Sequence, residues 1–75
     1  MPYKGYKIET EEFSLEVISV NKITNYVTSI KYVVKKGNNE LTEGIIYVTP
    51  KQDSRKVLRE TLQNIINAVK RVRVA

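Results

Sequence analysis

Lysine and tyrosine side chains lie near one another along much of this 75-residue chain. Lys22 is four positions before Tyr26, and Lys31 immediately precedes Tyr32. A tyrosine ring can stack on a flat aromatic ligand, while a nearby ammonium group can hold a phosphate. Tyrosine is also favoured in strands for packing alone, so each ring has a structural explanation as well. The chemistry that these residues could perform is non-covalent binding of an aromatic, anionic ligand.

The residue types that most catalytic and metal sites need are missing. The chain has no Cys and no His, which removes thiolate nucleophiles, imidazole acid–base chemistry, disulfides and the usual ligands of transition metals. A Ser or Thr nucleophile would need a Lys or a carboxylate as its base. Glu9, Glu11 and Glu12 cluster at a predicted turn without the spacing of a calcium loop, so we interpret them as a solvated rim. We therefore predict a protein that is not an enzyme and has no metal, cofactor or small-molecule substrate.

Charge is unevenly distributed along the sequence. Thirteen Lys and Arg against eight Asp and Glu give a formal net charge of +5. Residues 1–20 hold two Lys and four Glu, for a sum of −2, whereas residues 21–75 hold eleven basic and four acidic side chains, for a sum of +7. Such an excess attracts polyanions, with nucleic acid as the natural candidate. The alternative is that the lysines only keep a small protein soluble.

Length and hydropathy limit the architecture and the location. Seventy-five residues are enough for one hydrophobic core, so we expect a single domain over residues 1–75. The N-terminal residues 1–5 lack the apolar core of a signal peptide, and no stretch approaches the roughly 20 apolar residues of a membrane span. We expect an intracellular protein, cytoplasmic and associated with the nucleoid if its ligand is DNA.

Alternating and β-rich runs predict three or four strands in the first half of the chain. We expect turns at residues 21–25, where Asn tolerates left-handed backbone, and at residues 37–39, a Gly-Asn-Asn run. Gly44 predicts a bulge or a point of close approach within the last strand. The predicted strands cover residues 6–9, 13–20, 26–36 and 41–48.

The second half changes to a helical period. Thr49, Pro50 and Gln52 have the spacing of a capping box, although Asp53 or Ser54 could cap the helix instead. Apolar residues then recur at three- and four-residue intervals and predict one buried stripe. The predicted fold is α+β: three or four antiparallel strands followed by one C-terminal amphipathic helix that covers one face of the sheet. The stripe consists of Val57, Leu58, Thr61, Leu62, Ile65, Ile66 and Val69.

A helix on one face of the sheet leaves the other face open. Strand alternation places Ile30, Tyr32 and Val34 on one face of the third strand. We assign the wetter set, Ser29, Lys31, Val33 and Lys35, to the open face, with Tyr47 close by on the return strand. The basic C-terminal residues 70–75 suit the helix dipole, and would bind phosphate if they lay beside the sheet.

The junction between the last strand and the helix, residues 43–52, resembles the corresponding segment of the positive cofactor four family of transcriptional coactivators. That family carries a Gly-Ile-x-Leu-Asn-Pro-x-Gln pattern there, followed by an amphipathic helix that here ends at residues 65–70. Residues 18–23 and 29–31 are similar to the family's first hairpin, with Lys31 matching a basic strand residue. The similarity spans roughly residues 15–70. Departures from the family pattern are Ile23 in place of Phe, Asn25 in place of Gly, and Val33 and Val34 in place of aromatic residues.

The resemblance implies a homodimer, joined through its helices and sheets, whose curved strands bind single-stranded DNA with little sequence preference. Together with the charge, it leads to the prediction of a non-enzymatic binder of single-stranded DNA or RNA that assists transcription or replication. The alternative is a small protein-interaction module that acts through its helix or sheet edge. The residues predicted to bind nucleic acid are Lys22, Tyr26, Lys31, Lys35 and Tyr47, with Lys for phosphates and Tyr for stacking.

Overall fold

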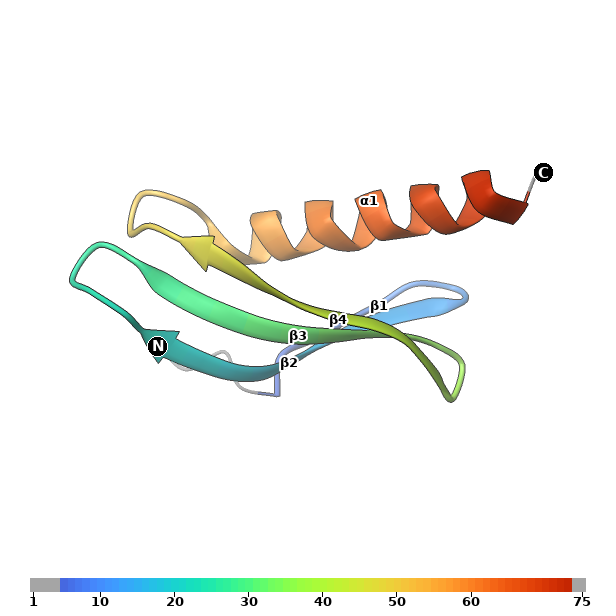
Figure 1. Cartoon of the computed structure of the whole chain (residues 1–75), viewed down its shortest axis with the longest axis horizontal. Helices are drawn as coiled ribbons and strands as arrows, with labels where there is room; N and C mark the ends of the chain where they lie inside the picture. Colours follow the sequence, from blue (N-terminus) through green and yellow to red (C-terminus); the bar gives the residue numbers. More distant parts are fainter. Residues whose placement is uncertain (1–4, 74–75) are drawn as a thin grey trace.

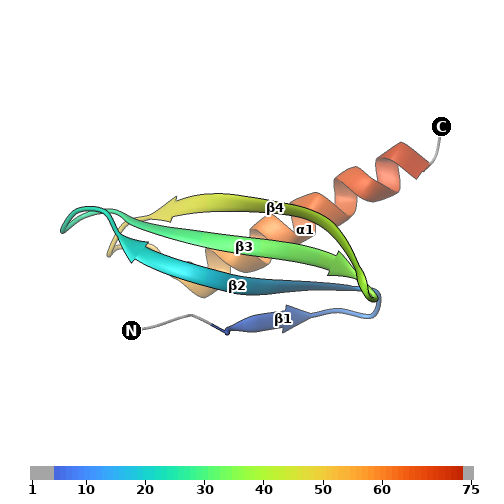
Figure 2. The same ribbon diagram turned by 60° about the horizontal axis from the view of Figure 1, so that its bottom comes forward.

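The protein folds as a four-stranded antiparallel sheet with one long helix on a single face (Figures 1 and 2). The computed structural model describes the backbone of residues 5–73 and the side chains of residues 5–71. The strands stand in chain order, β1-β2-β3-β4, and the sheet is curved and unclosed. This arrangement confirms the α+β prediction. The elements are β1 (Lys7–Glu9), β2 (Phe13–Lys22), β3 (Thr28–Lys36), β4 (Asn39–Val48) and α1 (Ser54–Arg73).

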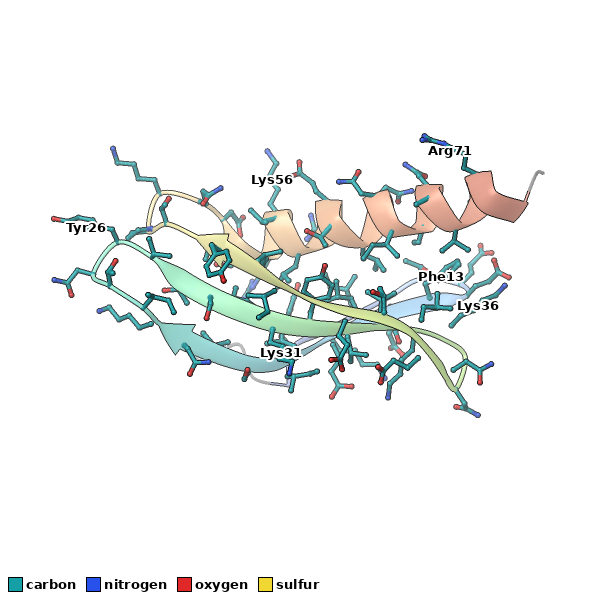
Figure 3. All side chains as sticks on the ribbon, in the orientation of Figure 1. Phe13, Tyr26, Lys31, Lys36, Lys56 and Arg71 are labelled. Atoms are coloured by element: carbon teal, nitrogen blue, oxygen red, sulfur yellow. The ribbon has the colours of Figure 1, made fainter. Side chains whose placement is uncertain are left out.

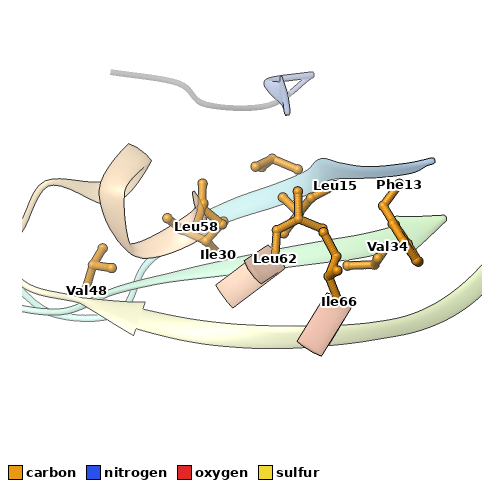
Figure 4. Packing of buried hydrophobic residues seen from close by; sticks show 9 residues of the cluster. Phe13, Leu15, Ile30, Val34, Val48, Leu58, Leu62 and Ile66 are labelled. Atoms are coloured by element: carbon orange, nitrogen blue, oxygen red, sulfur yellow. The ribbon is translucent and has the colours of Figure 1, made fainter. Parts of the chain in front are cut away.

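The hydrophobic core lies between α1 and the face of the sheet that it covers (Figure 4). Leu15, Ile30 and Leu58 are completely buried there, and the apolar stripe predicted for the helix provides the other side of the core. Burial of these side chains is the main source of stability, because each fully buried aliphatic side chain contributes about 1.5–3 kcal/mol. The cluster comprises Phe13, Leu15, Val17, Ile30, Val34, Val48, Leu58, Leu62 and Ile66.

The loop between β2 and β3 lies two residues later than predicted. We expected it at residues 21–25, but β2 continues to Lys22 and β3 begins at Thr28. The Thr24 hydroxyl oxygen accepts hydrogen bonds from the backbone N–H groups of Tyr26, at 3.0 Å, and Val27, at 3.1 Å. A side chain that satisfies two loop donors stabilises a turn at its own position. Strand pairing can therefore extend through residues 21 and 22.

The helix starts at Ser54, so the N-cap assigned to Thr49 is wrong and the alternative at Asp53 is correct. The Asp53 carboxylate accepts hydrogen bonds from the backbone N–H groups of Arg55, at 3.0 Å, and Lys56, at 3.4 Å. The Gln52 side chain accepts a bond from the Thr49 N–H, at 2.9 Å, which closes the preceding turn instead of the helix. Asp53 is the better cap because its carboxylate satisfies two otherwise unpaired helix donors.

Gly44 marks a close approach, one of the two alternatives predicted for it. It pairs with Tyr32 across β3 and β4, and a Cβ atom built on it would lie 2.5 Å from the Tyr32 hydroxyl oxygen. The bulge of β4 lies elsewhere, where Thr42 pairs with Val34 and Glu40 with Lys35. The tyrosine ring thus occupies the space that a side chain at position 44 would need.

Candidate nucleic-acid interface

The face of the sheet opposite α1, here named the open face, is set by the strand register. Residues directly opposite in neighbouring antiparallel strands point to the same side. Lys31 pairs with Ser19 and Ile45, and Ser29 pairs with Asn21 and Tyr47. The open face also carries Lys7, Glu9, Ser14, Glu16, Val33, Lys35, Glu40 and Glu43, which pair with one another in the same way.

The half of the open face next to the β2–β3 loop, named the loop half, holds no carboxylate. Its two cross-strand rows are Asn21–Ser29–Tyr47 and Ser19–Lys31–Ile45. Tyr47 is 63% exposed and Ile45 is 53% exposed, while Figure 3 shows Lys31 on the side of the sheet away from the helix. The loop half therefore combines an exposed aromatic ring, one cation and several hydroxyl and amide groups.

The other half of the open face, named the turn half, is acidic. Lys35 pairs directly with Glu40, and Glu43 and Glu16 flank Val33 on the two neighbouring strands. Lys7 forms an ion pair with Glu9, at 3.5 Å between its Nζ and a carboxylate oxygen. Four glutamates here outnumber two lysines. An incoming polyanion would be repelled from the turn half more than it would be attracted.

Val33 is less exposed than its assignment to the wetter set of β3 residues led us to expect. It points to the open face but is only 5% exposed, and it lines a shallow hollow together with Glu16, Ile18 and Lys35. Glu16 of β2 and Glu43 of β4 stand directly opposite it, and long side chains can lay their aliphatic parts over a neighbour. Val33 is thus a buried apolar side chain on the open face, outside the main core.

Lys22 and Tyr26 lie at the loop end of the sheet and not on the open face itself. Lys22 pairs with Thr28, which pairs with the core residue Val48, so its side chain starts on the covered side. Tyr26 is 74% exposed and stands at the tip of the β2–β3 loop (Figure 3). The structure thus gathers Tyr26, Lys31 and Tyr47 around one end of the sheet, with Lys22 at its margin. Lys35 is separate from them, in the turn half.

Two exposed apolar residues near this end were not among the predicted binding residues. Ile23 is 58% exposed in the β2–β3 loop, and Ile45 stands beside Lys31 on the open face. Apolar side chains in water suggest contact with a ligand or partner. The sequence signal for Ile23 was its place in a predicted turn. The sequence holds no such signal for Ile45, because the side of the sheet to which Ile45 points depends on the strand register.

The remaining electrostatic features are sparse. Lys7–Glu9 is the ion pair found among the described side chains. Lys36 lies over the Phe13 ring and Arg55 over the Tyr6 ring, each at 5.8 Å from the ring centroid. Residues 5–71 contain no group of three acidic side chains placed to hold a metal ion, and α1 is not apolar enough to cross a membrane. Lys22 and Lys31 therefore have no carboxylate partner within this part of the chain.

Comparison with known proteins found no matching family, no similar curated protein and no similar solved structure. Function must therefore be inferred from the residues and their geometry.

Proposed function

We propose that the protein binds single-stranded DNA or RNA without catalysing a reaction, as an accessory factor in transcription or replication. The binding surface is the loop half of the open face together with the β2–β3 loop, and Lys22 lies at the margin of this surface, at the end of β2. Tyr47 and Tyr26 stack on bases, while Lys31 and Lys22 contact phosphates. Lys35 contributes least of the five predicted residues, because Glu40 stands directly opposite it.

The observation that carries this proposal is the segregation of charge on the open face. All four glutamates lie in the turn half, whereas exposed Tyr47 shares the loop half with Lys31. A ring beside an unneutralised cation is the combination that nucleic-acid stacking platforms use. The resemblance to the positive cofactor four family agrees with the proposal, since Lys31 matches a basic strand residue there.

The dimensions of the loop half favour a single strand over a duplex. Strands lie about 4.8 Å apart, so three strands span about 10 Å and offer room for two or three bases. Stacking on Tyr47 requires a base with a free face, which a paired helix does not present. Binding to mixed sequences is expected, because every base has a face that can stack.

Fluorescence anisotropy with a labelled mixed-sequence oligonucleotide tests the proposal. We expect the affinity for the oligonucleotide to fall steeply as the salt concentration rises. Lys31→Ala should flatten the dependence of log K on log salt by about one unit. Tyr47→Ala should weaken binding about tenfold. Lys35→Ala is the matched control, since it removes the same charge from the same strand. Absence of binding at micromolar protein and low salt would exclude the function. Equal losses for Lys31→Ala and Lys35→Ala would exclude the loop half as the surface.

A second candidate function, a protein-interaction module, is favoured by the outer edge of β4. Within residues 5–73 this ten-residue strand pairs only with β3, so its other edge offers unpaired backbone groups. Leu41, Ile45 and Tyr47 on the same strand are exposed. A second copy of the chain fits this edge, in line with the homodimer that the family resemblance implies. Light scattering distinguishes a homodimer from a monomer that recruits another protein by strand addition.

A further inference from the structure

The basic excess of the protein lies on the helical layer and not on the sheet. Residues 5–48 carry five Lys against six Glu, for a sum of −1. Residues 49–71 carry six Lys and Arg against Asp53 and Glu60, for a sum of +4. The field that attracts polyanions to this protein therefore originates mainly from α1 and the segment before it. The loop half of the open face does not account for it.

Three cations of α1 extend into solvent, whereas Arg55 lies over the Tyr6 ring. Figure 3 shows Lys56 and Arg71 pointing outward from the helix, and Arg59 is exposed as well. None of the three has an ion-pair partner among the described side chains. Amide side chains of Gln63 and Asn67, which bond each other at 3.1 Å, lie between them. The exposed residues of this outer face are Lys56, Arg59, Glu60, Gln63, Asn64, Asn67, Lys70 and Arg71.

Lys70 differs from the other cations of the outer face. It lines a hollow of about 310 Å³ together with Glu11 and Glu12 of the β1–β2 turn, so nearby carboxylates offset its charge. Lys56, Arg59 and Arg71 form no ion pair among the described side chains, and Glu60, four residues after Lys56 on the same face, offsets part of the charge of Lys56. From position 56 to position 71 the helix rises about 22 Å, a length that can follow several phosphates of one strand.

We propose that the outer face of α1 is a second binding surface for a phosphodiester backbone, which lets one chain bridge two nucleic-acid strands. The surface lies on the layer opposite the open face (Figures 1 and 2), so a strand on each side would not collide with the other. No aromatic residue occurs in α1, and the surface therefore recognises phosphates without stacking on bases. The inference rests on the proposed function, because bridging requires the open face to hold the first strand.

A bridging assay tests this inference with two non-complementary oligonucleotides, one labelled with a donor dye and one with an acceptor. We expect energy transfer when the intact protein is added, and a loss of at least fivefold for the double variant Lys56→Gln/Arg71→Gln. The affinity of this variant for one oligonucleotide alone, measured by fluorescence anisotropy, should change less than threefold. Both substitutions suit an exposed helix, since Gln has a helix propensity close to that of Lys and Arg.

The matched control is Lys7→Gln/Lys36→Gln, which removes the same number of positive charges from the strands and should bridge like the unmodified protein. Equal bridging by the helix variant and the control would overturn the inference, and would indicate bridging through the open faces of a dimer. Binding of one oligonucleotide without any bridging would overturn it while leaving the proposed function intact. Loss of single-strand binding in the helix variant, with Lys31→Ala and Tyr47→Ala unaffected, would instead overturn the proposed function. If the outer face of α1 bound polyglutamate and not an oligonucleotide, the inference would be overturned, and the partner of this face would be an acidic protein.

Discussion

The two sides of β3 differ in their surroundings, because alternate residues of one strand point in opposite directions. Ile30 and Val34 are completely buried beneath α1, whereas Lys31, between them in sequence, is exposed on the open face. Substitutions on the covered side should therefore change the free energy of unfolding, and those on the open side should change ligand affinity. This division predicts that the fold and the proposed binding surface can be altered independently within nine residues.

The largest effect is expected at the covered side. Ile30→Ala should lower the free energy of unfolding by about 3 kcal/mol, because it leaves a cavity between the sheet and α1. Lys31→Ala on the adjacent position should change it by less than about 0.5 kcal/mol. Urea denaturation of both variants measures the difference. Similar losses at the two positions would show that the sheet does not separate folding from binding.

Val33 is an exception to the division between the buried side and the exposed side of β3. The loss of unfolding free energy on its substitution measures the size of this exception. It points to the open face but is almost fully buried among side chains of β2 and β4. Val33→Ala should cost about 1.5 kcal/mol of unfolding free energy, between the values for Ile30 and Lys31, since two buried methyl groups are removed. Thermal unfolding by circular dichroism is a suitable measurement. A change below about 0.5 kcal/mol would mean that Val33 belongs with the solvated residues of its face.

The smallest effect concerns the contact between Tyr32 and Gly44. Gly44→Ala should destabilise the protein by about 1 kcal/mol, because the new methyl group meets the Tyr32 ring, and this overpacking exceeds the gain from replacing a strand glycine. In a Tyr32→Val background the same substitution should become neutral or stabilising. A double-mutant cycle of denaturation free energies gives the coupling directly. Additive effects would contradict the proposed clash.

The strands, their antiparallel order and the helix stripe could be predicted because alternation and helical period report which residues face a core. The side of the sheet on which Lys22 lies could not be predicted from the sequence. A bulge between Val17 and Ser19 adds one residue to β2, so the positions that point toward the helix side are odd-numbered before it and even-numbered after it. Phe13 and Leu15 face the helix before the bulge, and Val20 and Lys22 share that side after it. No residue in this run identifies a bulge from sequence alone.

The segregation of charge on the open face was also beyond sequence reasoning. Glu40 and Lys35 are five positions apart in the chain, and they become direct neighbours only through the two-residue turn and the β4 bulge. Sequence alone therefore does not reveal which glutamates stand opposite the predicted lysines. Register, which depends on every turn and bulge at once, decided that Lys31 is unopposed and Lys35 is not.

The order of strands in the sheet, identical to their order in the chain, has a consequence for folding kinetics. Every strand pair closes across a short connection, of five residues between β2 and β3 and two between β3 and β4. Hairpins of this kind form within about 1–10 μs, and such local topology is associated with fast folding. A chain emerging from the ribosome can thus pair each strand with its predecessor as it appears. Docking of α1, which follows the strands in the chain, completes the core.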